Sequence, residues 1–138
     1  MKKILFISIA AALLVSACKK ENFAPASMDA DIAEADLVYR AVFTDGPYGR
    51  TMGIAKIYRN EVGDQLILDS FNVSNGPDLH VYLSRQLQPI NFIDLGKLQY
   101  NSGRQAYKIN GNVNFGDYKY ALIHCQQFDH LFGSSILQ

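Results

Sequence analysis

The residues best suited to chemistry lie close together near the end of the chain, where Cys125 follows His124 and precedes His130. A cysteine beside an imidazole can serve as a redox-active thiol, because a neighbouring imidazole favours the reactive thiolate form. Thiolate and imidazole groups are also metal ligands, for example of copper. A lone cysteine is often simply a small buried hydrophobic residue. The sequence therefore leaves four roles open for Cys125: redox thiol, metal ligand, half of an intermolecular disulfide or core residue.

A metal site would need a third residue from earlier in the chain. His80, Cys125 and His130 together supply two imidazoles and one thiolate, the set that blue-copper sites use. Their order, with one histidine far upstream of a cysteine and a second histidine, resembles the cupredoxin layout. No methionine follows His130, so an axial ligand would have to be a glutamine or a backbone carbonyl. Copper is therefore an alternative, and no cofactor is assigned.

Asp78 is the acidic residue nearest to His80 in the sequence, because it lies just before the segment that carries His80. One interpretation makes Asp78 a polar site residue that faces Cys125. However, an aspartate that follows a proline at a turn more often accepts backbone N–H bonds within that turn. We expect this capping role for Asp78.

Alternation along a strand indicates where these side chains point. The aliphatic residues at positions 79, 81 and 83 share one face, so His80 is expected to face away from the core. Residues 121, 123 and 125 share a face in the later strand. Cys125 and His124 should therefore point to opposite sides of one sheet.

From residue 37 onward, short β-prone segments are separated by turn residues, and helical periodicity is not sustained. The expected strands are Val38 to Thr44, Met52 to Arg59, Gln65 to Phe71, Leu79 to Ser84, Phe92 to Leu98, Ala106 to Ile109, Tyr118 to Gln126 and Phe132 to Leu137. The turn residues between them are Asp45-Gly46-Pro47, Glu61 to Asp64, Asn75-Gly76-Pro77, Asn101-Ser102-Gly103 and Asn110-Gly111. Parallel pairing would need helical crossovers, for which these gaps leave no room. The sequence predicts an all-β domain over residues 37–138, an antiparallel β-sandwich.

The N-terminus has the pattern of an export signal. Two lysines precede an uncharged, mostly apolar stretch that is too short to span a membrane, and Leu14 to Ala17 then lead into Cys18. This pattern resembles the lipobox of bacterial lipoproteins, in which the cysteine carries the lipid. We expect residues 1–17 to be a signal peptide and residues 18–36 a lipidated, flexible tether. Several acyl chains, such as palmitate, on Cys18 would hold the protein in the cell envelope, on the outer membrane or the cell surface and outside the cytoplasm.

Composition narrows the function further. Removal of residues 1–17 takes away two of the 13 Lys and Arg and none of the 13 Asp and Glu, which leaves a formal charge of −2. Because no basic stripe lies in the body of the chain, nucleic acid is not an expected partner. Hydrolase, zinc-protease and nucleotide-binding motifs are absent from the sequence, so we do not expect an enzyme. With one cysteine used for lipid, no disulfide remains to hold the domain together.

Three segments together resemble a known module. They are Asn75-Gly76-Pro77-Asp78-Leu79-His80-Val81-Tyr82-Leu83-Ser84, Leu95-Gly96-Lys97-Leu98, and Ile123-His124-Cys125-Gln126-Gln127-Phe128 with Phe132-Gly133. This set is similar to the DM-thirteen domain, a small all-β module that occurs beside cytochrome-type domains and in bacterial lipoproteins. The resemblance covers roughly Val38 to Leu137. It differs at His124, where the family commonly has an aromatic residue before the cysteine.

The resemblance implies electron transfer or another redox role centred on Cys125, with a redox protein as partner. Asp78, His124 and His130 are the supporting residues under this interpretation. A second interpretation is a non-catalytic binding module held out from the membrane, in which Cys125 is structural. Both interpretations share the fold and the lipid anchor. They differ in whether the sulfur of Cys125 is redox-active or only structural.

Overall fold

The computed structural model describes residues 36–138. Strands occur throughout this range, from Leu37 to Ile136. They are β1 (Leu37–Val42), β2 (Thr44–Asp45), β3 (Thr51–Asn60), β4 (Gly63–Val73), β5 (Leu79–Ser84), β6 (Phe92–Lys97), β7 (Ser102–Ile109), β8 (Tyr120–Cys125) and β9 (His130–Ile136). All the strand pairs are antiparallel. The described residues contain no α-helix.

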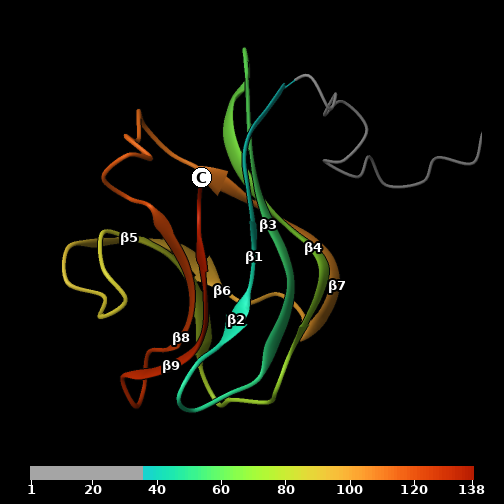
Figure 1. Cartoon of the computed structure of the whole chain (residues 1–138), viewed down its shortest axis with the longest axis vertical. Coiled ribbons are helices and arrows are strands. Elements are labelled where there is room, and N and C mark those ends of the chain that lie inside the picture. The colour runs from blue at the N-terminus through green and yellow to red at the C-terminus, as the bar shows by residue number, and fades with distance from the viewer. Residues whose placement is uncertain (1–35) are drawn as a thin grey trace, which may run out of the picture.

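The strands form two sheets that pack face to face (Figure 1). One sheet has the order β1-β3-β4-β7, and the other has the order β2-β9-β8-β5-β6. The chain changes sheets near its start, because β1 pairs with β3 whereas β2 pairs with β9. This arrangement confirms the predicted all-β antiparallel sandwich.

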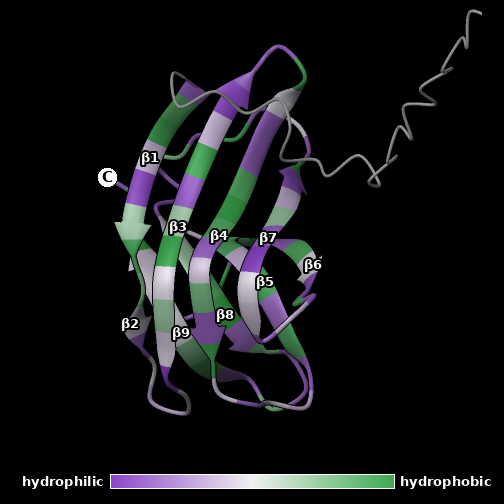
Figure 2. Ribbon diagram, turned by 90° about the vertical axis from the view of Figure 1, so that its right-hand side faces the viewer, coloured by the Kyte–Doolittle hydropathy of each residue, from purple (hydrophilic) through white to green (hydrophobic). Residues whose placement is uncertain are grey.

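The core lies between the sheets and is built by side-chain alternation. Hydrophobic and hydrophilic bands follow one another along β3 and β4 (Figure 2), although the bands can be several residues long, as for Leu66-Ile67-Leu68 in β4. From the five-stranded sheet, the odd-numbered residues of β5 and β8 point inward and are fully or almost fully buried: Leu79, Val81, Leu83, Ala121, Ile123 and Cys125. Burial of one such aliphatic side chain stabilises the fold by about 2 kcal/mol. The inward face predicted for β5 is therefore confirmed, and residues 121, 123 and 125 of β8 share one face, as predicted.

One predicted turn is wrong. Asn101-Ser102-Gly103 was expected to be a turn, but β7 already begins at Ser102, which pairs with Asn72. A β-bulge in β4 lies between Leu68 and Phe71, and the pairing with β7 continues beyond it. Gly103, which pairs with Phe71 there, has a positive φ of 96°. Gly103 therefore does have the positive φ that a turn glycine would have, but it lies in a strand that pairs beside a bulge.

The predicted signal peptide and most of the tether fall outside the described residues, which begin at residue 36. Residues 36–138 hold no helix that is long and apolar enough to cross a membrane.

Candidate functional site

Cys125 is the last residue of β8, and its side chain has no exposed surface. It pairs in register with Leu79 and belongs to the core cluster between the sheets. The next residue, Gln126, is exposed and begins the hairpin that leads to β9. The sulfur is thus enclosed by apolar side chains, yet it lies where a buried strand reaches the end of the sheet.

His130 is the register partner of Cys125 across the β8–β9 hairpin. Its imidazole ring stacks on the ring of Tyr48, with centroids 3.6 Å apart and planes only 2° from parallel. Phe128 lies next to the same imidazole at 5.9 Å. The structure therefore brings the backbones of Cys125 and His130 together, while the His130 ring is engaged by aromatic neighbours.

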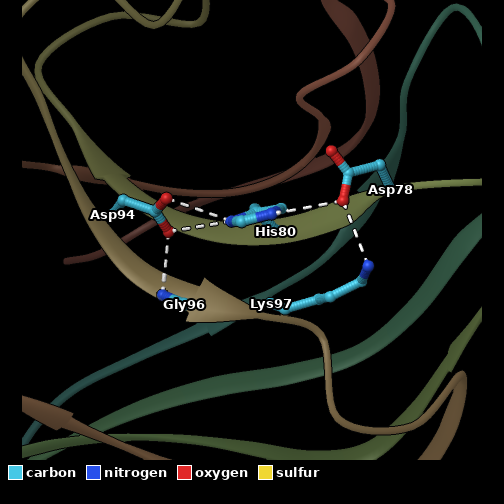
Figure 3. Close-up of polar contacts among 5 residues, drawn as sticks. All are labelled: Asp78, His80, Asp94, Gly96 and Lys97. Atoms are coloured by element: carbon cyan, nitrogen blue, oxygen red, sulfur yellow. Dashed lines mark hydrogen bonds and ion pairs between the residues drawn. The ribbon is translucent and has the colours of Figure 1, made fainter.

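His80 points to the other side of the sheet, as predicted, and lies between two carboxylates (Figure 3). Its Nδ1 atom is 3.0 Å from Asp94 Oδ2, and its Nε2 atom is 3.4 Å from Asp78 Oδ1. Lys97 Nζ lies 3.3 Å from the same Asp78 oxygen, and the Gly96 N–H donates to Asp94 Oδ1. Carboxylates and nitrogen-bearing side chains therefore alternate along this row.

A β-bulge in β6 explains how Asp94 and Lys97 share a face. His80 pairs with Lys97 and Tyr82 pairs with Asp94, so one extra residue is accommodated in β6 between these pairs. Without that extra residue, alternation would place positions 94 and 97 on opposite faces. Gly96 provides the bulge with a φ of 116°, a conformation that other residues rarely adopt.

Asp78 does not cap its own turn, contrary to our expectation, nor does its carboxylate face the sulfur of Cys125. The carboxylate lies against His80 and Lys97. Its backbone carbonyl accepts a hydrogen bond from the N–H of Gln126, at 2.9 Å. Asp78 therefore joins the polar row on the outer face to the end of the strand that carries Cys125.

His124 lies on the outer face of the sheet beside His80, its register partner, and its side chain is almost completely buried. Its ring stacks near Tyr82 with centroids 5.4 Å apart. The Nε2 atom is 3.3 Å from Asp129 Oδ1, whereas Nδ1 is buried without a hydrogen-bond partner. Burial lowers the pKa of His124, an effect that the Asp129 carboxylate opposes and that His130 and His80 reinforce. The geometry thus favours a neutral imidazole.

A hollow of about 210 Å³ opens beside His124. Its lining residues come from β5, β6, β8 and the loops beside them: Tyr82, Pro89, Phe92, His124, Gln126 and Asp129. The rings of Tyr82 and Phe92 contact each other, with centroids 4.2 Å apart. The outer face therefore combines aromatic surface, an imidazole, an amide and a carboxylate in one depression.

The structure does not assemble the predicted copper-type set. Cys125 points into the core, His80 lies on the outer face of the same sheet, and His130 stacks on Tyr48. Because alternation places Cys125 and His80 on opposite faces of one sheet, no rotation of side chains brings these two groups to one ion. Over residues 36–138 no group of three or more His, Cys, Asp and Glu side chains is placed to hold a metal ion.

Sequence reasoning missed Asp94, Phe92 and Asp129 as members of this face. Asp94 depends on the bulge at Gly96, and the glycine is the one local signal that could have indicated it. Asp129 reaches His124 because it adopts a positive φ of 55° in the β8–β9 hairpin. The side-chain contacts of both aspartates depend on pairings between strands, which alternation within one strand does not reveal.

Comparison with known proteins gives a match to a protein family. A family model described as Electron transfer DM13 matches residues 43–137, a range that includes His80, His124 and Cys125. No curated protein and no solved structure matches the chain. The matched range agrees with the span of the predicted resemblance and covers both sheets.

Proposed function

The chain belongs to the Electron transfer DM13 family, and from this premise we propose that it is an electron-transfer module of the cell envelope with Cys125 as its redox-active group. The family match over residues 43–137 is the observation that carries the proposal. Cys125 is the free cysteine within the described residues, and thiols are the most readily oxidised side chains.

The burial of Cys125 restricts the chemistry. Thiol–disulfide exchange requires an attacking thiolate to reach the sulfur, and packed core side chains prevent that approach. Loss of one electron from the thiol, together with one proton, needs no such contact. In this proposal an oxidising redox protein partner accepts the electron, and solvent water at the exposed hairpin after Cys125 accepts the proton.

The lipid anchor completes the proposal. The lipobox-like sequence before Cys18 supports attachment to a membrane by acyl chains, with the domain outside the cytoplasm. A membrane-bound carrier and its partner meet by diffusion in two dimensions, so a small, weakly interacting surface is sufficient for transfer. The protein would then act as a carrier and not as an enzyme with its own substrate.

Protein-film voltammetry of the full chain, purified from its native membrane, tests the redox role. We expect a redox signal in the wild-type protein that disappears in Cys125→Ala. Ile123→Val is the matched control, because it also removes a small volume from the inner face of β8 and leaves the sulfur in place. A signal that persists in Cys125→Ala would exclude Cys125, and an absorption spectrum would then show whether a bound chromophore carries the electron.

One observation favours a second function. Cys125 is packed among aliphatic residues like any other core residue, which suits a non-catalytic binding module with a structural cysteine. For that function, Cys125→Ala should lower the stability of the domain and leave every electron-transfer measurement at its wild-type value.

A further inference from the structure

The hollow beside His124 is built from groups that favour a positive ligand. Tyr82 is almost completely buried beneath it, whereas Phe92 is 39% exposed at its rim. Aromatic rings attract cations through the negative potential of their faces. Pro89 and the two rings supply the apolar part of the wall.

The carboxylate in this hollow is only partly balanced. Within the described part of the chain, Asp129 contacts the amide of Gln88 and the imidazole of His124, both at 3.3 Å. The amide carries no formal charge. Because burial lowers the pKa of His124, the imidazole is predominantly neutral at pH 7 as well. The negative charge of Asp129 therefore remains available to a ligand.

From these contacts we infer that the hollow binds a guanidinium group, which stacks on Phe92 and pairs with the carboxylate of Asp129. A planar guanidinium combines several N–H donors with a flat face, so it can use an aromatic wall and a carboxylate at once. Gln126 also lines the hollow. This inference is independent of the redox role of Cys125.

The guanidinium could come from a free small molecule or from an arginine side chain of a partner protein. The small volume and the exposed rim suit either source, since only the head of the ligand needs to enter. Two probes therefore separate the sources: ethylguanidinium chloride, and the capped tripeptide Gly-Arg-Gly.

Titration of the ¹⁵N-labelled full chain in detergent, followed by NMR, measures binding through the backbone amides of His124 and Gln126. We expect saturable shifts with ethylguanidinium and weaker ones with propylammonium, which has the same charge but no planar head. Tighter binding of the tripeptide would indicate a protein arginine. Tighter binding of ethylguanidinium would indicate a free small molecule.

Phe92→Ala and Asp129→Asn should each weaken binding at least about fivefold, the effect of losing one aromatic contact or one charge-assisted hydrogen bond at a partly exposed site. Asparagine tolerates the positive φ at position 129. The matched controls are Phe128→Ala and Asp117→Asn, which remove an exposed ring and an exposed carboxylate outside the hollow and should leave the affinity unchanged. Equal binding of propylammonium, equal effects of the controls, or shifts that do not saturate would each overturn the inference.

Discussion

At the scale of single residues, Cys125 and His124 show how neighbours in sequence acquire different chemistry. Cys125 points into the apolar core, while His124 points to the outer face among Tyr82 and Asp129. Alternation along β8 separates the thiol from the adjacent imidazole, so His124 cannot act on the sulfur directly. Any interaction between them must pass through the strand backbone or through the register partners on β5 and β9.

The burial of Cys125 leads to a prediction about its reactivity. In the folded full chain, Cys125 should react with a water-soluble thiol reagent near neutral pH more slowly than free cysteine does, because the reagent cannot reach the sulfur. Reaction should become fast after denaturation. Labelling kinetics followed by mass spectrometry measure this rate, with Cys125→Ser as the blank. Fast labelling of the folded chain would show that the end of β8 opens. The proposed mechanism would then change from loss of an electron by the buried thiol to thiol–disulfide exchange.

His124 gives a prediction about pH. Burial lowers its pKa below the ordinary value of 6.5, so the folded protein takes up this proton less readily than the unfolded chain does. Its contribution to stability is complete above pH 6.5 and is lost as the pH falls through the folded pKa. Imidazole NMR signals should therefore show a midpoint below 6.5 for His124, and the melting temperature should decrease over the same range. The facing groups Asp129, His130 and His80 must be titrated in the same spectra. A midpoint above 6.5 would mean that the attraction to Asp129 dominates over burial.

At the scale of strands, β-bulges decide which side chains meet. The bulge at Gly96 brings Asp94 and Lys97 to the face of His80, and a second bulge lies in the β8–β9 pairing just before His124. Each bulge changes the alternation by one residue and so redirects the strand beyond it. The outer face of the five-stranded sheet therefore depends on irregular positions as much as on regular pairing.

Two glycines of the other sheet give a matched pair of substitutions: Gly53 lies at the β-bulge in the pairing of β3 with β4, and Gly63 is the first residue of β4. Gly53 and Gly63 both have positive φ, 118° and 131°, but a Cβ atom on Gly53 would lie 2.8 Å from the Phe71 Cα, whereas one on Gly63 meets open space. Gly63→Ala should therefore cost about 1 kcal/mol of unfolding free energy, the backbone cost alone. Gly53→Ala should cost at least about 2 kcal/mol more, because backbone atoms must move to relieve the clash. Urea unfolding measures both values, and equal costs would contradict the close packing at Gly53.

The strand elements could be predicted from the sequence because alternation and turn residues are local signals. The faces of His80, His124 and Cys125 followed from the same signal. The contacts of Asp78 and Asp94 could not be predicted, since they depend on the pairing of β5 with β6 and with the distant β8, and on a bulge whose position no local pattern determines. The hollow beside His124 likewise needs β5, β6 and the β8–β9 hairpin in place before it exists.

At the scale of the whole molecule, the sandwich separates two environments. The interior between the sheets encloses the thiol, and the outer face of the five-stranded sheet carries charged and aromatic groups open to partners. β5 and β8 contribute to both environments through opposite faces. A partner that docks on the outer face would therefore lie one sheet thickness from the sulfur, a separation of roughly 10 Å or less, given the ordinary spacing of packed sheets.

The last prediction tests the proposed lipid anchoring in the cell envelope, and it rests on Cys18. The apolar segment before it is too short to span a membrane, so stable attachment requires the lipid that the lipobox-like sequence predicts. Cys18→Ala should therefore either release the mature protein from membranes or leave it unprocessed, while the β-sandwich folds as before. Fractionation of cells, with the mature N-terminus determined by mass spectrometry, distinguishes these outcomes, and Ser27→Ala in the tether is the control.

Because each buried methylene contributes about 0.8 kcal/mol, loss of the acyl chains removes essentially all of the membrane affinity. A Cys18→Ala protein that is cleaved after residue 17 and still sediments with membranes would show that another contact holds it there. The outer face of the five-stranded sheet would then be the first surface to test.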